Sequence, residues 1–324
     1  MMIAVTVVLI LLTWYVPFFS IIGMFICGVP MACLAARNGW KTTAIALVGV
    51  FAVTFLVTGS LLSAVSLILM SILPGAVAGV YLGKGTNFFT TLFITCLAVC
   101  IGWLFEIFVI DKFIHGEGID AMMSEMLSQF RQVFEATMAN LPAEMNSDEL
   151  QKAVESTVEM MSYMLRLYFP SIVVITSMVI GYVIVRFCSF FIKRLKIKDI
   201  YTVPFSMLKA PKSMSTAAVV LYLISIFGNK EGAFWAVSAN VVLILYTIIG
   251  VCGLSLIDNK LSKKISKGGV RALIYVALFL FGGGLMAMAA NLLVIVGILD
   301  SSHNFRKISG DGQPFEGGDG GGWV

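Results

Sequence analysis

The stretch that decides the fold is Asp111–Phe169, DKFIHGEGIDAMMSEMLSQFRQVFEATMANLPAEMNSDELQKAVESTVEMMSYMLRLYF. It separates two apolar blocks, 88–110 and 170–192, and it is the one long stretch too polar to lie in a bilayer. Ten acidic residues against four basic ones give it a net charge of −6, whereas the whole chain of 324 residues carries +4. The rest of the chain therefore carries +10, and this asymmetry predicts a membrane topology.

The composition outside this stretch is that of a membrane protein. Hydrophobic residues make up 59% of the chain, charged residues 12%, and the mean hydropathy is +0.96, whereas ordinary globular chains have roughly 25% charged residues. The apolar blocks lack the alternation of barrel strands, so helices are the structure that satisfies their backbone in a bilayer. We predict an all-α, polytopic helical membrane protein with about nine transmembrane helices, in a range of eight to ten. The blocks are 1–16, 18–36, 42–58, 60–82, 88–110, 170–192, 213–228, 232–257 and 271–299.

Loop charges predict the orientation of these helices. Basic residues follow the second, fourth, sixth and eighth blocks, and the loops between them have no basic excess. The positive-inside rule then predicts a multi-pass protein of the cell membrane with the acidic insert 111–169 outside and the basic loops 193–212 and 258–271 in the cytoplasm. The C-terminus lies outside if 271–299 is one helix. Because Gly282–Gly284 interrupts that block, a broken or re-entrant helix stays open.

The same pattern predicts the domain organisation. Residues 1–192 form a six-helix membrane unit interrupted by the insert, 193–212 form a basic cytoplasmic linker, 213–299 form the C-terminal membrane helices, and the Gly-rich tail 300–324 is disordered. Within the insert, apolar residues recur at spacings of three and four, which is typical of two amphipathic helices. Pro142 ends the first, and Asn146 with Glu149 resembles a capping box that begins the second. We expect the two helices to form a lid over the outer ends of the membrane helices. The first apolar block is short for a span of about 20 residues, which favours a start codon upstream of Met1.

Small residues predict where the membrane helices pack. Gly75, Gly79 and Gly83 form a GxxxGxxxG pattern, and Ala32 and Ala36 form a weaker small-xxx-small pair. Such patterns let helix backbones approach closely in a membrane. A packing seam is the favoured interpretation, and the lining of a substrate path is the alternative.

Polar residues at membrane depth are the candidate substrate-binding residues. Glu106 lies about one turn inside the outer end of 88–110, beside Trp103, and Arg166 and Lys112 are alternative candidate partners for its carboxylate. Asn240 and Asn291 lie within later helices. For Glu106 a snorkelling interfacial carboxylate is the alternative, and for the asparagines it is an interhelical hydrogen bond of about 1 kcal/mol.

No arrangement of residues indicates an enzyme, a cofactor or a metal site. His115 and His303 stand apart without metal-ligand spacing, and all six cysteines lie in apolar segments. Neither GxSxG nor HExxH occurs, and nothing resembles a soluble nucleic-acid-binding module. We therefore expect no enzymatic activity, no cofactor and no nucleic-acid partner.

Several short motifs together resemble the YybS-like family of uncharacterised, multi-spanning bacterial membrane proteins over essentially the whole chain. They are Tyr15-Val-Pro-Phe18, Gly28-Val-Pro30, Arg37-Asn-Gly-Trp40, Arg194-Leu195, Val203-Pro-Phe205, Ala210-Pro-Lys212, Asn240, Leu245-Tyr246, Ile249-Gly250, Gly297-Ile-Leu-Asp300 and Asn304-Phe-Arg-Lys307. In that family an aromatic residue and an acid usually precede the closing Phe-Arg, and here Ser302, His303 and Asn304 depart from the pattern. The resemblance implies the fold and no activity.

The first six helices also resemble the substrate-binding S-component of energy-coupling-factor vitamin transporters. In those proteins a small-residue motif like Ala32-x3-Ala36 contacts the membrane coupling partner, although it lies on the first helix there and on the second here. The resemblance implies a subunit that binds a small solute from outside, with coupling ATPases on separate chains. The alternative function is a structural protein whose acidic insert docks an envelope protein. In either case the lipid bilayer is a partner.

Overall fold

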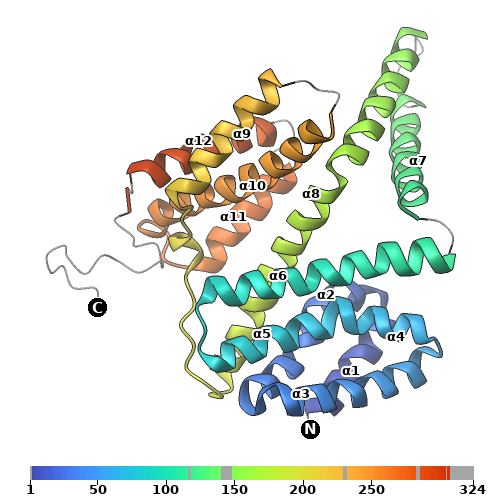
Figure 1. Ribbon diagram of the computed structural model, residues 1–324, viewed down its shortest axis with the longest axis vertical. Helices are drawn as coiled ribbons and strands as arrows, with labels where there is room; N and C mark the ends of the chain where they lie inside the picture. The colour runs from blue at the N-terminus through green and yellow to red at the C-terminus, as the bar shows by residue number, and fades with distance from the viewer. Residues whose placement is uncertain are drawn as a thin grey trace, which may run out of the picture. The chain divides into compact units, whose positions relative to one another are not determined.

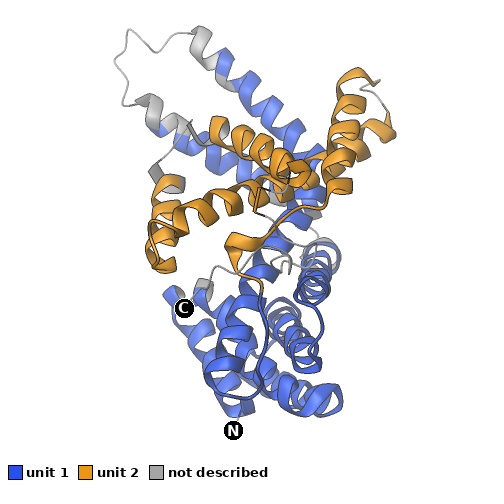
Figure 2. Cartoon of the chain, turned by 90° about the vertical axis from the view of Figure 1, so that its left-hand side faces the viewer, with its two compact units in different colours: residues 1–202 blue, residues 203–324 orange. Residues whose placement is uncertain are grey.

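The computed structural model describes residues 2–115, 118–139, 148–228, 232–281, 285–303 and 305–306. The chain divides into two compact units, unit 1 (Met1–Thr202) and unit 2 (Val203–Val324), which Figure 2 shows in separate colours. The described residues are helical with short connections, and no strand occurs among them.

Five of the helical stretches in the described residues are long and apolar enough to cross a bilayer, and four shorter ones are apolar as well. The prediction of an all-α polytopic membrane protein is therefore confirmed. The five long stretches are Ile22–Thr58, Leu61–Lys84, Phe88–Ile110, Glu155–Arg194 and Ala233–Ser262. The four shorter ones are Met2–Tyr15, Lys212–Phe227, Gly268–Leu278 and Met288–His303.

The elements of unit 1 are α1 Met2–Tyr15, α2 Pro17–Ile26, α3 Gly28–Thr58, α4 Leu61–Leu67, η1 Ile68–Ile72, α5 Leu73–Lys84, α6 Phe88–Phe105, η2 Glu106–His115, α7 Gly118–Ala139 and α8 Asp148–Arg194 (Figure 1). A buried core in unit 1 is shared by α1, α3, η1 and α5. Inside α3, Gly39 has φ 76° and ψ −174°, so the helix is broken there, at a conformation that glycine tolerates. Met31 before the break and Val50 after it belong to one buried cluster. The predicted blocks 18–36 and 42–58 are thus distinct helical segments that meet in one core.

The predicted small-residue patterns lie opposite one another on α3 and α5. A Cβ on Gly75 would lie 2.6 Å from the Cα of Gly28, and a Cβ on Gly79 would lie 2.5 Å from the Cα of Ala32. Farther along, a Cβ on Gly83 would lie 2.7 Å from the Cα of Ala36. The two segments run parallel with a constant offset, and each glycine is needed because the opposing backbone fills the space of a side chain.

Two segments of unit 1 are π-helical. η1 joins α4 to α5 within one continuous membrane span, and η2 continues α6 from Glu106 onward. A π-turn contains one more residue per turn than an α-turn, so it shifts the direction of the side chains that follow. Such turns occur frequently at functional sites.

The long helix α8 corrects the predicted boundary between the insert and the sixth membrane block. It runs unbroken for 47 residues and contains Pro170. A proline in a helix leaves one backbone carbonyl without its usual donor, which membrane helices tolerate with local adjustment. One helix therefore contains both the second amphipathic segment of the insert and the block 170–192. The membrane part of α8 lies against α6, because a Cβ on Gly181 would be 3.1 Å from the Cα of Cys96.

The predicted lid is wrong for the described part of the insert. α7 packs on η2 and on α8, with no comparable packing against α1 to α5. Figure 1 shows α7 beside the first part of α8. Met123 and Val158 are buried, as the amphipathic pattern requires, whereas Met126 and Val133 of the same pattern are exposed. Pro142 and Asn146 lie outside the described residues.

Unit 2 is built on two parallel helices. Its elements are η4 Phe205–Met207, α9 Lys212–Phe227, α10 Ala233–Ser262, α11 Gly268–Phe281 and α12 Leu285–His303. The hydroxyl of Tyr246 in α10 donates a hydrogen bond of 2.9 Å to Asn291 in α12. Farther along both helices, a Cβ on Gly253 would lie 3.1 Å from the backbone nitrogen of Gly297. Because the later residue of α10 meets the later residue of α12, the two helices run in the same direction.

The predicted single block 271–299 is two helices. α11 ends at Phe281 and α12 begins at Leu285, on either side of the three glycines, which have low helix propensity. α11 leaves the end of α10, where Arg271 contacts Asp258, and α12 returns toward that end, where Arg306 contacts Ser255. Asp300 and Asp258 therefore lie at the same end of unit 2.

Candidate functional site

Glu106 lies at the junction of α6 and η2 and is half-buried. The hydroxyl of Ser66, on α4, donates a hydrogen bond of 2.5 Å to its Oε2. A Cβ on Gly102 would lie 2.9 Å from the carbonyl oxygen of Leu69 in η1, so α6 lies directly against the first π-helical segment. Both helices that hold this carboxylate thus depart from α-geometry next to it.

Trp103 precedes Glu106 by three residues, a spacing that puts both side chains on one helix face. Its Nε1 atom is buried and has no acceptor among the described residues. An indole N–H is a donor only, and a buried donor without an acceptor is costly. Trp103 and Glu106 together offer one donor and one charged acceptor at one place in the fold.

The other predicted binding residues lie on α8, α10 and α12. Arg166 is exposed on α8. Asn240 donates to the carbonyl of Ala236 in its own helix at 2.9 Å. Asn291 accepts a hydrogen bond of 2.9 Å from the hydroxyl of Tyr246, which links α12 to α10.

Unit 2 contains a buried arginine that the sequence interpretation missed. The side chains of Arg306 and Asp300 are each 2% exposed, and their atoms Nη2 and Oδ2 are 2.6 Å apart. The Nε atom of Arg306 donates to the same Oδ2 at 3.1 Å. Its other donors bind the carbonyls of Ser206 and Leu208 and the hydroxyl of Ser255, at 2.7, 2.8 and 2.7 Å. All five N–H groups of the guanidinium are used.

We call this set the Arg306 clasp: Arg306, Asp300, Ser255 and the backbone of Ser206 and Leu208. Its only sequence signals are an acid at the end of an apolar helix and an arginine six residues later. It also holds the short segment around η4, because Ser255 donates to the carbonyl of Phe205 at 2.6 Å. The clasp fixes three separate parts of unit 2 to one side chain.

Unsatisfied and perturbed groups surround the clasp. Oδ1 of Asp300 and Oγ of Ser301 are buried and have no hydrogen-bond partner among the described residues. Burial lowers the pKa of the Lys209 ammonium, the Asp300 carboxylate partly offsets this, and Arg306 and Lys212 lower that pKa further. Lys209 thus has both a carboxylate and positive charges near it.

A second arginine binds the end of α10 to the start of α11. Nε of Arg271 lies 2.8 Å from Oδ1 of Asp258, and the hydroxyl of Tyr275 donates to the same oxygen at 3.0 Å. Nη1 of Arg271 also donates to the carbonyl of Ile265 at 2.8 Å. Arg271 belongs by sequence to the basic loop 258–271, whereas in the structure it is paired with Asp258 within unit 2.

The fold and these polar contacts define a multi-spanning helical membrane protein with charged side chains held inside its helix bundles. Residues 4–301 match the family described as predicted membrane protein (DUF2232), and the chain belongs to this family. No curated protein and no solved structure matches the chain. The expectation of an uncharacterised membrane-protein family is thereby confirmed.

The structure does not leave Ala32 and Ala36 available for the role that the S-component resemblance implied. Ala32 is fully buried. Both alanines lie against Gly79 and Gly83 of the same chain. The small-residue face is filled from within unit 1, so we do not assign a coupling partner to it.

Proposed function

We propose that this protein is a solute-binding membrane subunit of a transport system, and that Glu106 and Trp103 contact the solute. The observation that carries the proposal is the pairing of a half-buried carboxylate with a buried indole N–H that has no acceptor among the described residues. A solute that donates to Glu106 and accepts from Trp103 would satisfy both groups.

The charge of the chain favours a cationic or amine-bearing solute. The stretch 111–169, with its net charge of −6, begins five residues after Glu106. An acidic entrance raises the local concentration of small cations and speeds their association. In this proposal the insert faces outside, the basic loops face the cytoplasm, and the solute enters from outside.

The π-helical segments η1 and η2 lie next to the proposed site, since η1 follows Ser66 by two residues and η2 begins at Glu106. π-helical turns occur frequently at functional sites. The resemblance of the first six membrane blocks to transporter S-components supports the same class of function. Coupling subunits on separate chains would then contact a face other than Ala32 and Ala36.

Ligand-dependent stabilisation of the purified protein tests this proposal. The full chain in mild detergent is heated with amine-bearing vitamins, small organic amines and metal cations, each near 100 times its dissociation constant where that is known. A ligand that binds only the folded state stabilises it by about 2.7 kcal/mol at that concentration. Glu106→Gln, which keeps an acceptor for Ser66 but removes the charge, should abolish the shift, and Trp103→Phe should weaken it.

Two matched variants control this experiment. Glu155→Gln removes an exposed acid of α8, and Trp40→Phe removes an exposed tryptophan, 48% exposed, from α3. Both should keep the full ligand shift. The proposal fails if no member of the panel stabilises the protein, or if Glu106→Gln retains the shift.

A second candidate function rests on the surface of the insert. Apolar side chains on α7 and on the first part of α8 are exposed, and an exposed apolar surface of this kind is typical of protein-binding sites. They are Met126, Val133, Met160, Tyr163 and Met164. As a structural protein, the chain would dock an envelope partner here. A photo-crosslinking residue at Val133 should capture one partner, and one at the exposed position Ile45, in the apolar part of α3, should not; equal capture at both positions would reject docking.

A further inference from the structure

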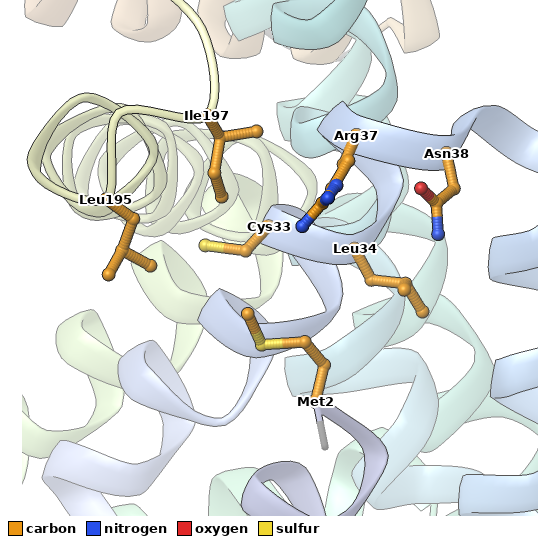
Figure 3. A pocket seen from close by; sticks show the side chains of 7 residues that line it. All are labelled: Met2, Cys33, Leu34, Arg37, Asn38, Leu195 and Ile197. Atoms are coloured by element: carbon orange, nitrogen blue, oxygen red, sulfur yellow. The ribbon is translucent and has the colours of Figure 1, made fainter.

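A pocket of about 470 Å³ lies in unit 1 at the end of the first half of α3, where the chain leaving α8 passes by. Its polar lining consists of Arg37 and Asn38, and its apolar lining includes Cys33, Leu34, Leu195 and Ile197. Figure 3 shows the guanidinium of Arg37 turned toward the middle of the labelled side chains, between Ile197 and Met2. The volume lies in the range of small-molecule sites.

The electrostatic surroundings of this pocket are strongly positive. Residues 1–105 contain no acid, and the single acid in 170–202 is Asp199. Arg37 has no carboxylate partner among the described residues, since the structure describes no ion pair for it. The pocket is therefore lined by an exposed guanidinium that has no counter-charge among the described residues.

The turn after α8 carries a lysine, Lys196, between two residues that line the pocket. The amide of Lys196 donates to the carbonyl of Lys193, and the amide of Ile197 donates to the carbonyl of Ile192, the hydrogen-bond pattern of a Schellman helix end. This pattern places Lys196 at φ 53°, a left-handed conformation that favours glycine. A lysine holds this turn at a cost of about 1 kcal/mol relative to glycine, between the two residues, Leu195 and Ile197, that line the pocket.

We propose that this pocket binds an anionic phospholipid from the leaflet at the basic end of unit 1. The phosphate oxygens accept hydrogen bonds from the guanidinium of Arg37 and the amide of Asn38, with Lys196 near the rim. The start of an acyl chain lies along Leu34, Leu195 and Ile197. The lining matches this occupant because it combines one unpaired cation and one amide with apolar side chains. This inference is independent of the proposed solute site at Glu106.

Native mass spectrometry of the full chain in detergent tests the assignment with defined lipids. The wild-type protein should retain phosphatidylglycerol in preference to phosphatidylcholine. Arg37→Gln should reduce the retained phosphatidylglycerol about tenfold or more, since a hydrogen bond to a charged group contributes roughly 1.5–3 kcal/mol. Lys41→Gln, which removes an exposed cation of α3 outside the pocket lining, should leave it unchanged.

Lys196→Gly separates binding from folding. Glycine relieves the left-handed strain, so the melting temperature should stay level or rise, while retention of phosphatidylglycerol should fall. A variant with higher stability and unchanged lipid retention would overturn the role of Lys196. Unchanged retention in Arg37→Gln, or an equal loss in Lys41→Gln, would overturn the pocket itself.

A competition arm distinguishes the lipid from free phosphate. Inorganic phosphate at millimolar concentration should not displace phosphatidylglycerol, because it cannot replace the contact of an acyl chain with the apolar lining. Displacement at that concentration would instead assign the pocket to a soluble phosphate compound and would overturn the lipid proposal.

Discussion

Replacing Arg306 by methionine should destabilise the protein more than any single surface change. The substitution removes all five hydrogen bonds of the clasp, and it leaves the 2%-exposed Asp300 side chain without its counter-charge. Removing one partner of a buried ion pair typically costs about 3–5 kcal/mol. The carbonyls of Ser206 and Leu208 also lose a donor each, so we expect the upper part of that range.

The assay is thermal unfolding of the purified protein in detergent, followed by size-exclusion chromatography of the remaining folded fraction. A loss of this size corresponds to a lower melting temperature by on the order of 10 °C. The double variant Arg306→Met with Asp300→Leu removes both charges, so it should regain a large part of the lost stability. Arg194→Met, which removes an exposed arginine at the end of α8, is the matched control and should change little.

Two outcomes would refute this reasoning. If Arg306→Met lowers the free energy of unfolding by less than about 1 kcal/mol, the clasp is not a stabilising contact. If the double variant loses more free energy of unfolding than the two single variants lose in sum, the charge left behind is not the main cause of the loss.

Three further predictions concern packing, pH dependence and topology. Gly79→Ala should destabilise the protein by about 1–3 kcal/mol because its Cβ would meet the backbone of the opposing helix. Gly49→Ala, with open space around it, should be neutral or stabilising by up to about 1 kcal/mol. Equal melting temperatures of the two variants would reject the close packing of α3 and α5. Because the pKa of Lys209 is lowered on folding, the unfolded state binds more protons between that pKa and its ordinary value, so stability should rise with pH across this window. Lys209→Met should therefore be more stable than wild type at neutral pH, with a difference that shrinks as the pH approaches about 10.5; a constant difference would contradict the pKa shift. In a cysteine-free background in intact cells, a membrane-impermeant maleimide should label Ser128→Cys and leave Lys264→Cys unlabelled, and the reverse pattern would invert the proposed topology.

The fold class followed from composition because the distribution of apolar residues directly determines which segments can enter a bilayer. The ends of individual helices were harder to predict from the sequence. Pro170 is locally a signal for a helix end, yet α8 passes through it. An apolar segment in a bilayer satisfies its backbone best as a helix, and packing against α6 supports this membrane part. The glycines after Phe281 were a clear local signal for a helix end, and α11 does end at Phe281 before α12 begins at Leu285.

The candidate site was predictable only as far as single residues. Glu106 stands out in sequence because an acid at membrane depth is costly, but its contact with Ser66 joins residues 40 apart. The clasp is harder still, since Arg306 reaches carbonyls about 100 residues away. Backbone carbonyls carry no side-chain identity, so no pattern of residue types marks them as partners. The π-helical form of η1 and η2 likewise has no signature in the local sequence.

The parallel packing of α10 and α12 has an electrostatic consequence. Helices that run side by side in the same direction align their macrodipoles, so the partly negative carboxyl-terminal ends gather at one end of the unit. Arg271 and Arg306 lie at that end and are bound by Asp258 and Asp300. Their positive charges offset both the negative ends of the helix dipoles and the two carboxylates. The two arginines are therefore paired within unit 2, so the lysines near this end, among them Lys209, Lys212, Lys260, Lys263 and Lys264, are left as its unpaired cations among the charges described above.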